Sequence, residues 1–121
     1  MRRCRQEGSD DIVRTAYVSS LDVLNRAIRA YGTETQCVVL FEEMSELQKE
    51  VCKHWRGSDN IGAITEELAD VHIMLEQLRM MMGIDVDSVC TACAGKIDRL
   101  DKRLNREDGD HLETERHGFS D

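Results

Sequence analysis

Apolar side chains recur at steps of three and four residues along four long segments of this chain, and that spacing constrains its fold most strongly. An α-helix has about 3.6 residues per turn, so such a repeat places one apolar stripe along each helix. The stripes predict helices over about residues 10–31, 34–56, 60–82 and 85–104. The 121 residues include no proline and only eight glycines, which favours long helices over a sheet.

The breaks between these segments are short and contain Gly32, Gly57 and Gly83. Short connections predict that consecutive helices are antiparallel neighbours, so we expect an all-α, four-helix antiparallel domain over residues 10–105. Residues 1–9 and 106–121 are polar and aperiodic, and we expect them to be flexible. The third segment is apolar nearly all round, which is typical of a central helix or a subunit interface. We therefore expect an obligate oligomer, most simply a two-fold dimer.

The charge balance excludes some partners. Sixteen Lys and Arg against 24 Asp and Glu give a net charge of −8, which disfavours binding to nucleic acid polymers and to anionic membranes. The basic N-terminus is not followed by an apolar stretch, and no segment approaches the length of a membrane span. These observations predict a cytoplasmic protein.

Cys90 and Cys93 fall on an apolar stripe, so we expect reduced core cysteines rather than a zinc site. His72 lies in the apolar third segment, and we expect it to be a hydrogen-bonded core residue.

Two pairs of acidic residues carry the chemistry. Glu43 and Glu46 lie three residues apart on the second predicted helix, and Glu67 and Asp70 lie three apart on the third. Such a spacing puts both carboxylates on one side of a helix, about 4.5 Å apart along its axis. Glu46 and Glu67 are equally far from the predicted turn, and so are Glu43 and Asp70. Residues equally far from the turn of an antiparallel hairpin lie at one level, so the hairpin brings all four carboxylates together.

Four converging carboxylates repel one another unless a cation neutralises them, and oxygen ligands suit Mg²⁺, with Mn²⁺ as a possible substitute. The structural alternative is a solvated acidic face. A ferritin-like di-iron site requires a histidine three residues after a glutamate, and neither Glu43 nor Glu67 has one.

The stretches Phe41–Lys49 and Glu66–Val71 resemble the paired motif of MazG-like, all-α nucleoside triphosphate pyrophosphohydrolases, E-E-x-x-E followed after a spacer by E-x-x-D. The resemblance covers about residues 10–104. It implies a MazG-like four-helix fold that works as a dimer or tetramer, Mg²⁺, and cleavage between the α- and β-phosphates. The implied metal ligands are Glu43, Glu46, Glu67 and Asp70. Glu50 continues the Glu43 and Glu46 face, and we expect Glu46 and Glu50 to act in catalysis, Glu50 as a partner of the ligands or as a water-orienting base.

Lys96, Arg99 and Arg103 recur at i, i+3 and i+7 on the fourth predicted helix. They match a basic segment of the same family, K-x-x-R-L-x-x-R-L, and we expect them to bind the polyphosphate of the substrate. An ordinary solvated helix with an Asp98–Lys102 pair is the alternative.

Together with these features, the resemblance implies Mg²⁺-dependent hydrolysis of (deoxy)nucleoside triphosphates to a nucleoside monophosphate and pyrophosphate, in nucleotide-pool house-cleaning. Two alternatives stay open. One is phosphoribosyl-ATP pyrophosphohydrolase, and the other is a non-catalytic helical interaction protein.

Overall fold

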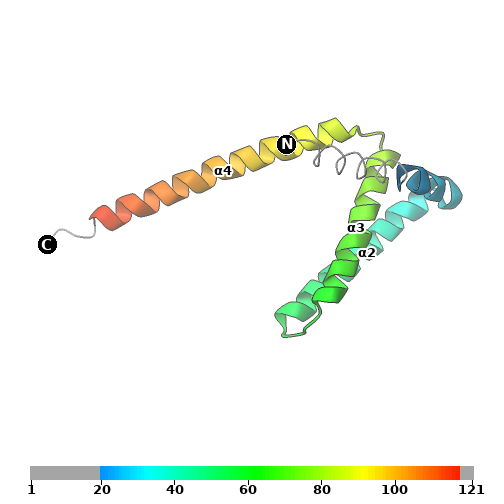
Figure 1. Cartoon of the computed structure of the whole chain (residues 1–121), viewed down its shortest axis with the longest axis horizontal. Coiled ribbons are helices and arrows are strands. Elements are labelled where there is room, and N and C mark those ends of the chain that lie inside the picture. The colour runs from blue at the N-terminus through cyan, green and yellow to red at the C-terminus, as the bar shows by residue number, and fades with distance from the viewer. Residues whose placement is uncertain (1–19, 118–121) are drawn as a thin grey trace, which may run out of the picture. The chain divides into compact units, whose positions relative to one another are not determined.

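The computed structural model describes residues 20–117, with side chains described as far as residue 109, and this range contains helices and no strand. A helix over residues 20–31 is followed by α2 (Thr33–Trp55), α3 (Ile61–Met81) and α4 (Val86–His117) (Figure 1). The predicted all-α class is therefore confirmed. The predicted flexible segment 1–9 and the first half of the predicted helix 10–31 lie outside the described residues.

The helix ends agree with the sequence for α2 and α3, each of whose bounds differs from the prediction by about one residue. The predicted end of α4 at Leu104 is wrong, because the helix continues to His117. The apolar stripe does stop at Leu104. However, residues 105–117 contain no proline and several strong helix formers, so nothing in them ends the helix. The flexibility expected of residues 106–121 stays a prediction.

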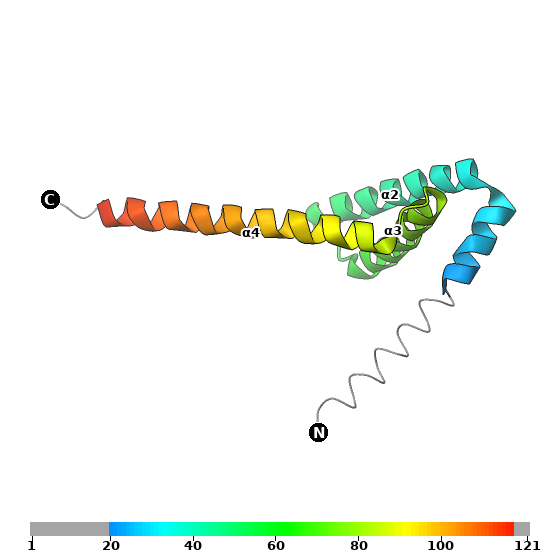
Figure 2. The same cartoon turned by 90° about the horizontal axis from the view of Figure 1, so that it is seen from above.

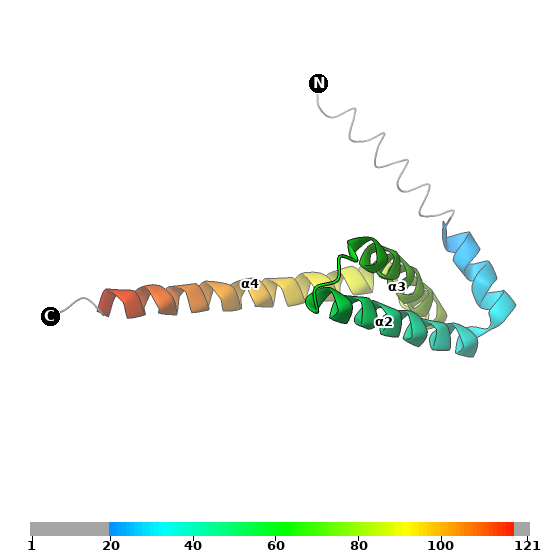
Figure 3. The same cartoon turned by 90° about the horizontal axis from the view of Figure 1, so that it is seen from below.

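The chain divides into two compact units, one ending at Gly83 and one beginning at Ile84. In the first unit α2 and α3 lie side by side and antiparallel, as the three views agree (Figures 1, 2 and 3). Whether residues 10–105 act as one domain stays a prediction.

The turn of this hairpin is held by two features. Gly57 has a φ of 102°, a left-handed conformation that a residue with a Cβ adopts only with strain. The side-chain amide of Asn60 donates to the backbone oxygen and to Oε2 of Glu50, each at 2.8 Å. Asn60 therefore links the start of α3 to the last turns of α2.

The apolar core of the hairpin is small. Among the described side chains, the buried apolar ones are Leu40 on α2 and Val71 and Met74 on α3. Most of both apolar stripes is exposed, including Phe41 at 65% and Trp55 at 83%. The two helices of one hairpin cannot cover apolar residues on several sides of each helix. His72 lies on a side of α3 that α2 does not cover, and it is exposed. Its prediction as a core histidine is therefore wrong.

The second unit is built on α4. Asp85 caps its first turn, because its Oδ1 accepts from the backbone N–H of Asp87 at 2.8 Å and its Oδ2 accepts from the Ser88 hydroxyl at 3.3 Å. Cys90 and Cys93 are free, but both are exposed, which corrects the prediction that they belong to a core. None of the helices in the described range has a stretch apolar and long enough to cross a bilayer.

Candidate metal centre

Three carboxylates from two helices meet midway along the hairpin. Glu43 on α2 lies beside Glu67 and Asp70 on α3, and one oxygen of each lies within 4.8 Å of the other two. We call these three residues the acidic cluster. It forms because Glu43 and Asp70 are equally far from the turn, and because Glu67 lies one helical turn from Asp70 on the same side of α3. The predicted meeting of the two acidic pairs is thus observed for three of the four residues.

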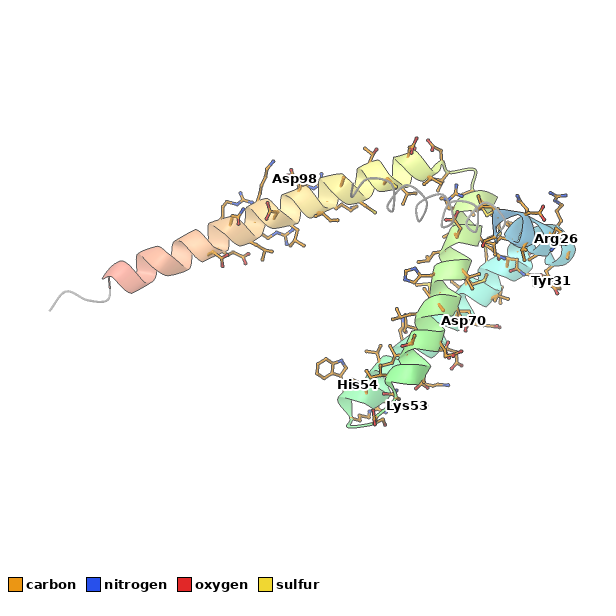
Figure 4. The ribbon with its side chains drawn as sticks, viewed as in Figure 1. Arg26, Tyr31, Lys53, His54, Asp70 and Asp98 are labelled. Carbon is orange, nitrogen blue, oxygen red and sulfur yellow. The ribbon has the colours of Figure 1, made fainter. Side chains whose placement is uncertain are left out.

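The acidic cluster lies at the edge of the hairpin rather than in its core. Glu43 and Glu67 are half-buried and Asp70 is exposed; Figure 4 labels Asp70 on α3. Partial burial raises the pKa of Glu43, and the nearby charges of Asp70 and Glu67 raise it further. Such a site concentrates negative charge and remains open to solvent. Its oxygen donors are the kind that a hard divalent cation prefers.

Glu46 lies outside the acidic cluster in this structure. Its Oε2 pairs with Nζ of Lys49 at 2.5 Å, and about half of each side chain is exposed. The hydrogen bond with Glu46 is the main cause that raises the pKa of Lys49, and the charge of Glu67 adds to it. Lys49 therefore contributes a positive charge beside the acidic cluster. The sequence indicates this ion pair, because Lys49 follows Glu46 by three residues and such residues are neighbours on a helix.

Glu50 also lies apart from the acidic cluster, at the turn of the hairpin. It is buried, and its carboxylate accepts a hydrogen bond from Lys53 at 2.8 Å besides that from Asn60. These two hydrogen bonds lower the pKa of Glu50. Figure 4 labels Lys53 near the same turn.

The predicted phosphate-binding cations all lie on α4, in the second unit. Arg99 and Arg103 line an open groove between long side chains of this helix, and Lys102 and Arg106 line it with them. Lys96 does not line this groove. Sequence reasoning missed Lys102 and Arg106, although the four cations recur at i, i+3, i+4 and i+7 and so share one side of the helix. Lys102 pairs with Asp98 at 2.9 Å, as the structural alternative expected.

Comparisons of this chain with protein-family models, with curated proteins and with solved structures gave no match.

Proposed function

We propose that this protein is a Mg²⁺-dependent hydrolase that converts nucleoside triphosphates to nucleoside monophosphates and pyrophosphate, and that it removes surplus or non-standard nucleotides. The observation that carries the proposal is the acidic cluster, in which two helices bring three carboxylates within 4.8 Å of one another. The resemblance of the two acidic motifs to MazG-like enzymes supplies the choice of reaction.

The residues of the acidic cluster fit a divalent cation. They supply only oxygen donors. Burial raises the pKa of Glu43, the charges of Asp70 and Glu67 raise it further, and a cation would relieve this repulsion between carboxylates. Bound Mg²⁺ would bind phosphate oxygens and acidify water, which are the two contributions that hydrolysis of a phosphoanhydride needs. We assign Glu43, Glu67 and Asp70 as its ligands.

Glu46 is the fourth proposed ligand. It lies one helical turn from Glu43, and its charge is close enough to raise the pKa of that residue. Its ion pair with Lys49 is solvent-exposed, and exposed pairs contribute little free energy, so exchanging Lys49 for a cation costs little.

We assign Glu50 to the hairpin turn and not to proton transfer. A general base must be able to take up a proton near neutral pH, and the hydrogen bonds from Lys53 and Asn60 lower the pKa of Glu50. Its buried carboxylate also has two donors already.

The role of Lys96, Arg99 and Arg103 in binding polyphosphate remains part of the proposal. The groove on α4 adds Lys102 and Arg106 as further candidates. Cations on one side of a helix suit a leaving pyrophosphate, whose charge exceeds that of orthophosphate.

The test is pyrophosphate release from a panel of ribo- and deoxyribonucleoside triphosphates and phosphoribosyl-ATP, with Mg²⁺ and with EDTA. In ¹⁸O-water, attack at the α-phosphorus places the label in the monophosphate alone. Label in pyrophosphate, or direct release of orthophosphate, would contradict the proposed bond. Strong preference for phosphoribosyl-ATP would favour that alternative, and no Mg²⁺-dependent turnover on any substrate would refute the proposed activity.

A further inference from the structure

The apolar residues of α4 repeat with a spacing of alternating four and three residues. The residues of this repeat, the α4 seam, are Val86, Cys90, Cys93, Ile97, Leu100 and Leu104. A repeat of seven residues with two apolar positions is the pattern of helices that wind around a partner helix in a coiled coil. When the seven positions of the repeat are labelled a to g, Cys90, Ile97 and Leu104 occupy position a. Val86, Cys93 and Leu100 occupy position d.

The α4 seam has no cover within its own unit. All six of its residues are exposed, and Ile97 exposes 66% of its surface. They span about 27 Å of one continuous helix, at 1.5 Å per residue. An apolar stripe of this length is stable in water only when another surface covers it.

Charged residues flank the α4 seam on both sides, with opposite signs. Lys96 and Arg103 occupy position g on one side, and Asp87, Asp101 and Asp108 occupy position e on the other. Among the described side chains of α4, the ion pair formed is Asp98–Lys102, at positions b and f on the opposite side of the helix. These flanking charges therefore have no ion-pair partner among the described residues of their own helix.

This pattern of charge favours a second copy of the same helix as the partner. In a parallel pair of helices in register, each g residue faces the e residue five positions later in the other helix. Lys96 then meets the second copy's Asp101, and Arg103 meets the second copy's Asp108, and symmetry repeats both pairs. In an antiparallel pair, g faces g and e faces e, so cations would face cations and carboxylates would face carboxylates.

We propose that α4 is a self-association surface, on which two copies of this chain form a parallel, in-register, two-stranded coiled coil through the α4 seam. Ile97 at a and Leu100 at d are the combination that favours two strands. The proposal does not depend on the proposed catalytic activity. In the dimer Lys96 and Arg103 pair between chains, so Arg99, Lys102 and Arg106, which lie on the outer side of the helix, replace them as the cations proposed to bind polyphosphate.

Cysteine cross-linking of the full-length chain tests the orientation. The first variant keeps Cys93 as its single cysteine, with serine at positions 4, 37, 52 and 90. The second has the same background with Cys93→Ser and Leu104→Cys. With diamide as the oxidant of the two thiols, we expect both to form covalent dimers. Positions 93 and 104 are about 16 Å apart along the helix, and an antiparallel pair cannot bring each beside its own copy. A matched control, Asp98→Cys in place of Cys93, lies on the outer side and should stay monomeric on a non-reducing gel.

Charge reversal tests the partner. In the Cys93-only chain, Lys96→Glu with Arg103→Glu makes both sides of the α4 seam acidic, and we expect cross-linking to fall about tenfold or more. Adding Asp101→Lys and Asp108→Lys exchanges the two signs and should restore it, since each g residue again meets its opposite. Circular dichroism of each variant checks that the helices persist. Absence of cross-linking in the parent chain, cross-linking at position 93 but not at 104, or cross-linking insensitive to both sets of changes would overturn the proposal.

Discussion

The charge of Glu43 is unfavourable in the folded state, because burial raises its pKa and the charges of Asp70, Glu67, Glu42 and Glu46 raise it further. A raised carboxylate pKa means that the ionised form destabilises the folded state, and that this cost disappears as the pH falls toward the ordinary glutamate value. Without divalent cations, we expect Glu43→Gln to raise the thermal midpoint at neutral pH by a few degrees at most, since the site is half-exposed.

Thermal melts in EDTA across a pH series measure this difference. The gain of the Glu43→Gln variant over the parent should shrink steadily as the pH is lowered, because protonation then relieves the same repulsion in the parent. A gain in thermal midpoint that is independent of pH would show that the ionised Glu43 carboxylate does not destabilise the folded state.

Asp70 provides the sharpest test of the metal assignment. Asp70→Asn keeps the shape of the side chain but removes one negative ligand, so we expect turnover to fall by about a hundredfold or more. Glu66→Gln is the matched control, because Glu66 is an exposed neighbour on the same helix outside the acidic cluster. The assay is pyrophosphate release at limiting Mg²⁺. Near-parental turnover of Asp70→Asn would mean that the assigned site is wrong.

The sequence correctly predicts which carboxylates meet across the hairpin where their positions relative to the turn decide this. It fails for carboxylates that pair with a lysine on their own helix. Glu43 and Asp70 meet because they are equally far from one turn, and Glu67 joins them because it lies one helical turn from Asp70; both relations can be counted along the chain. Glu46 and Glu50 each have a lysine three residues later, and those lysines bind them in the structure. Periodicity gives the side of a helix on which a carboxylate lies, but it does not decide between two partners on that side.

At the scale of the element, Asn60 joins the two helices of the α2–α3 hairpin through its hydrogen bonds to Glu50. Its amide satisfies both the carboxylate and the backbone oxygen of Glu50, and loss of a hydrogen-bond donor to a buried carboxylate is costly. We expect Asn60→Ala to lower the thermal midpoint by several degrees and to weaken Mg²⁺ binding.

The neighbouring substitution Asp59→Ala is the control for this prediction, because Asp59 is exposed and makes no hydrogen bond in the described part of the chain. Melting curves with and without Mg²⁺ separate the two effects. If Asn60→Ala and Asp59→Ala melt alike, the link between the helices is not what holds the turn.

Helix lengths show a second limit of sequence reasoning. The ends of α2 and α3 coincide with the ends of their apolar stripes, because Gly57 and Gly83 then allow the chain to leave the helix. On α4 the stripe stops at Leu104 but the helix does not. A stripe reports what a helix packs against, while the helix itself ends only where the backbone is interrupted.

At the scale of the whole molecule, the exposed apolar surface of the hairpin leads to a prediction about assembly. A folded chain whose described core consists of Leu40, Val71 and Met74 has little stability of its own. We expect the folded state to be an oligomer, so the thermal midpoint should rise with protein concentration. Sedimentation velocity and melting curves over a hundredfold range of about 1–100 µM test this. A folded monomer with a midpoint independent of concentration would contradict it.

The turn between α2 and α3 also determines where this gene can change in length. One residue inserted between Arg56 and Asn60 and absorbed by the start of α3 would shift that helix by about 1.5 Å and rotate it by about 100°. The hairpin could still pack an apolar side, but Glu67 and Asp70 would face away from Glu43. Insertions and deletions at this turn should therefore abolish the proposed metal binding, while we expect them to be tolerated at the connection before α4. A library of single-codon insertions, scored separately for expression and for Mg²⁺-dependent stabilisation, tests this. We expect insertions at this turn to keep expression and to lose stabilisation by Mg²⁺.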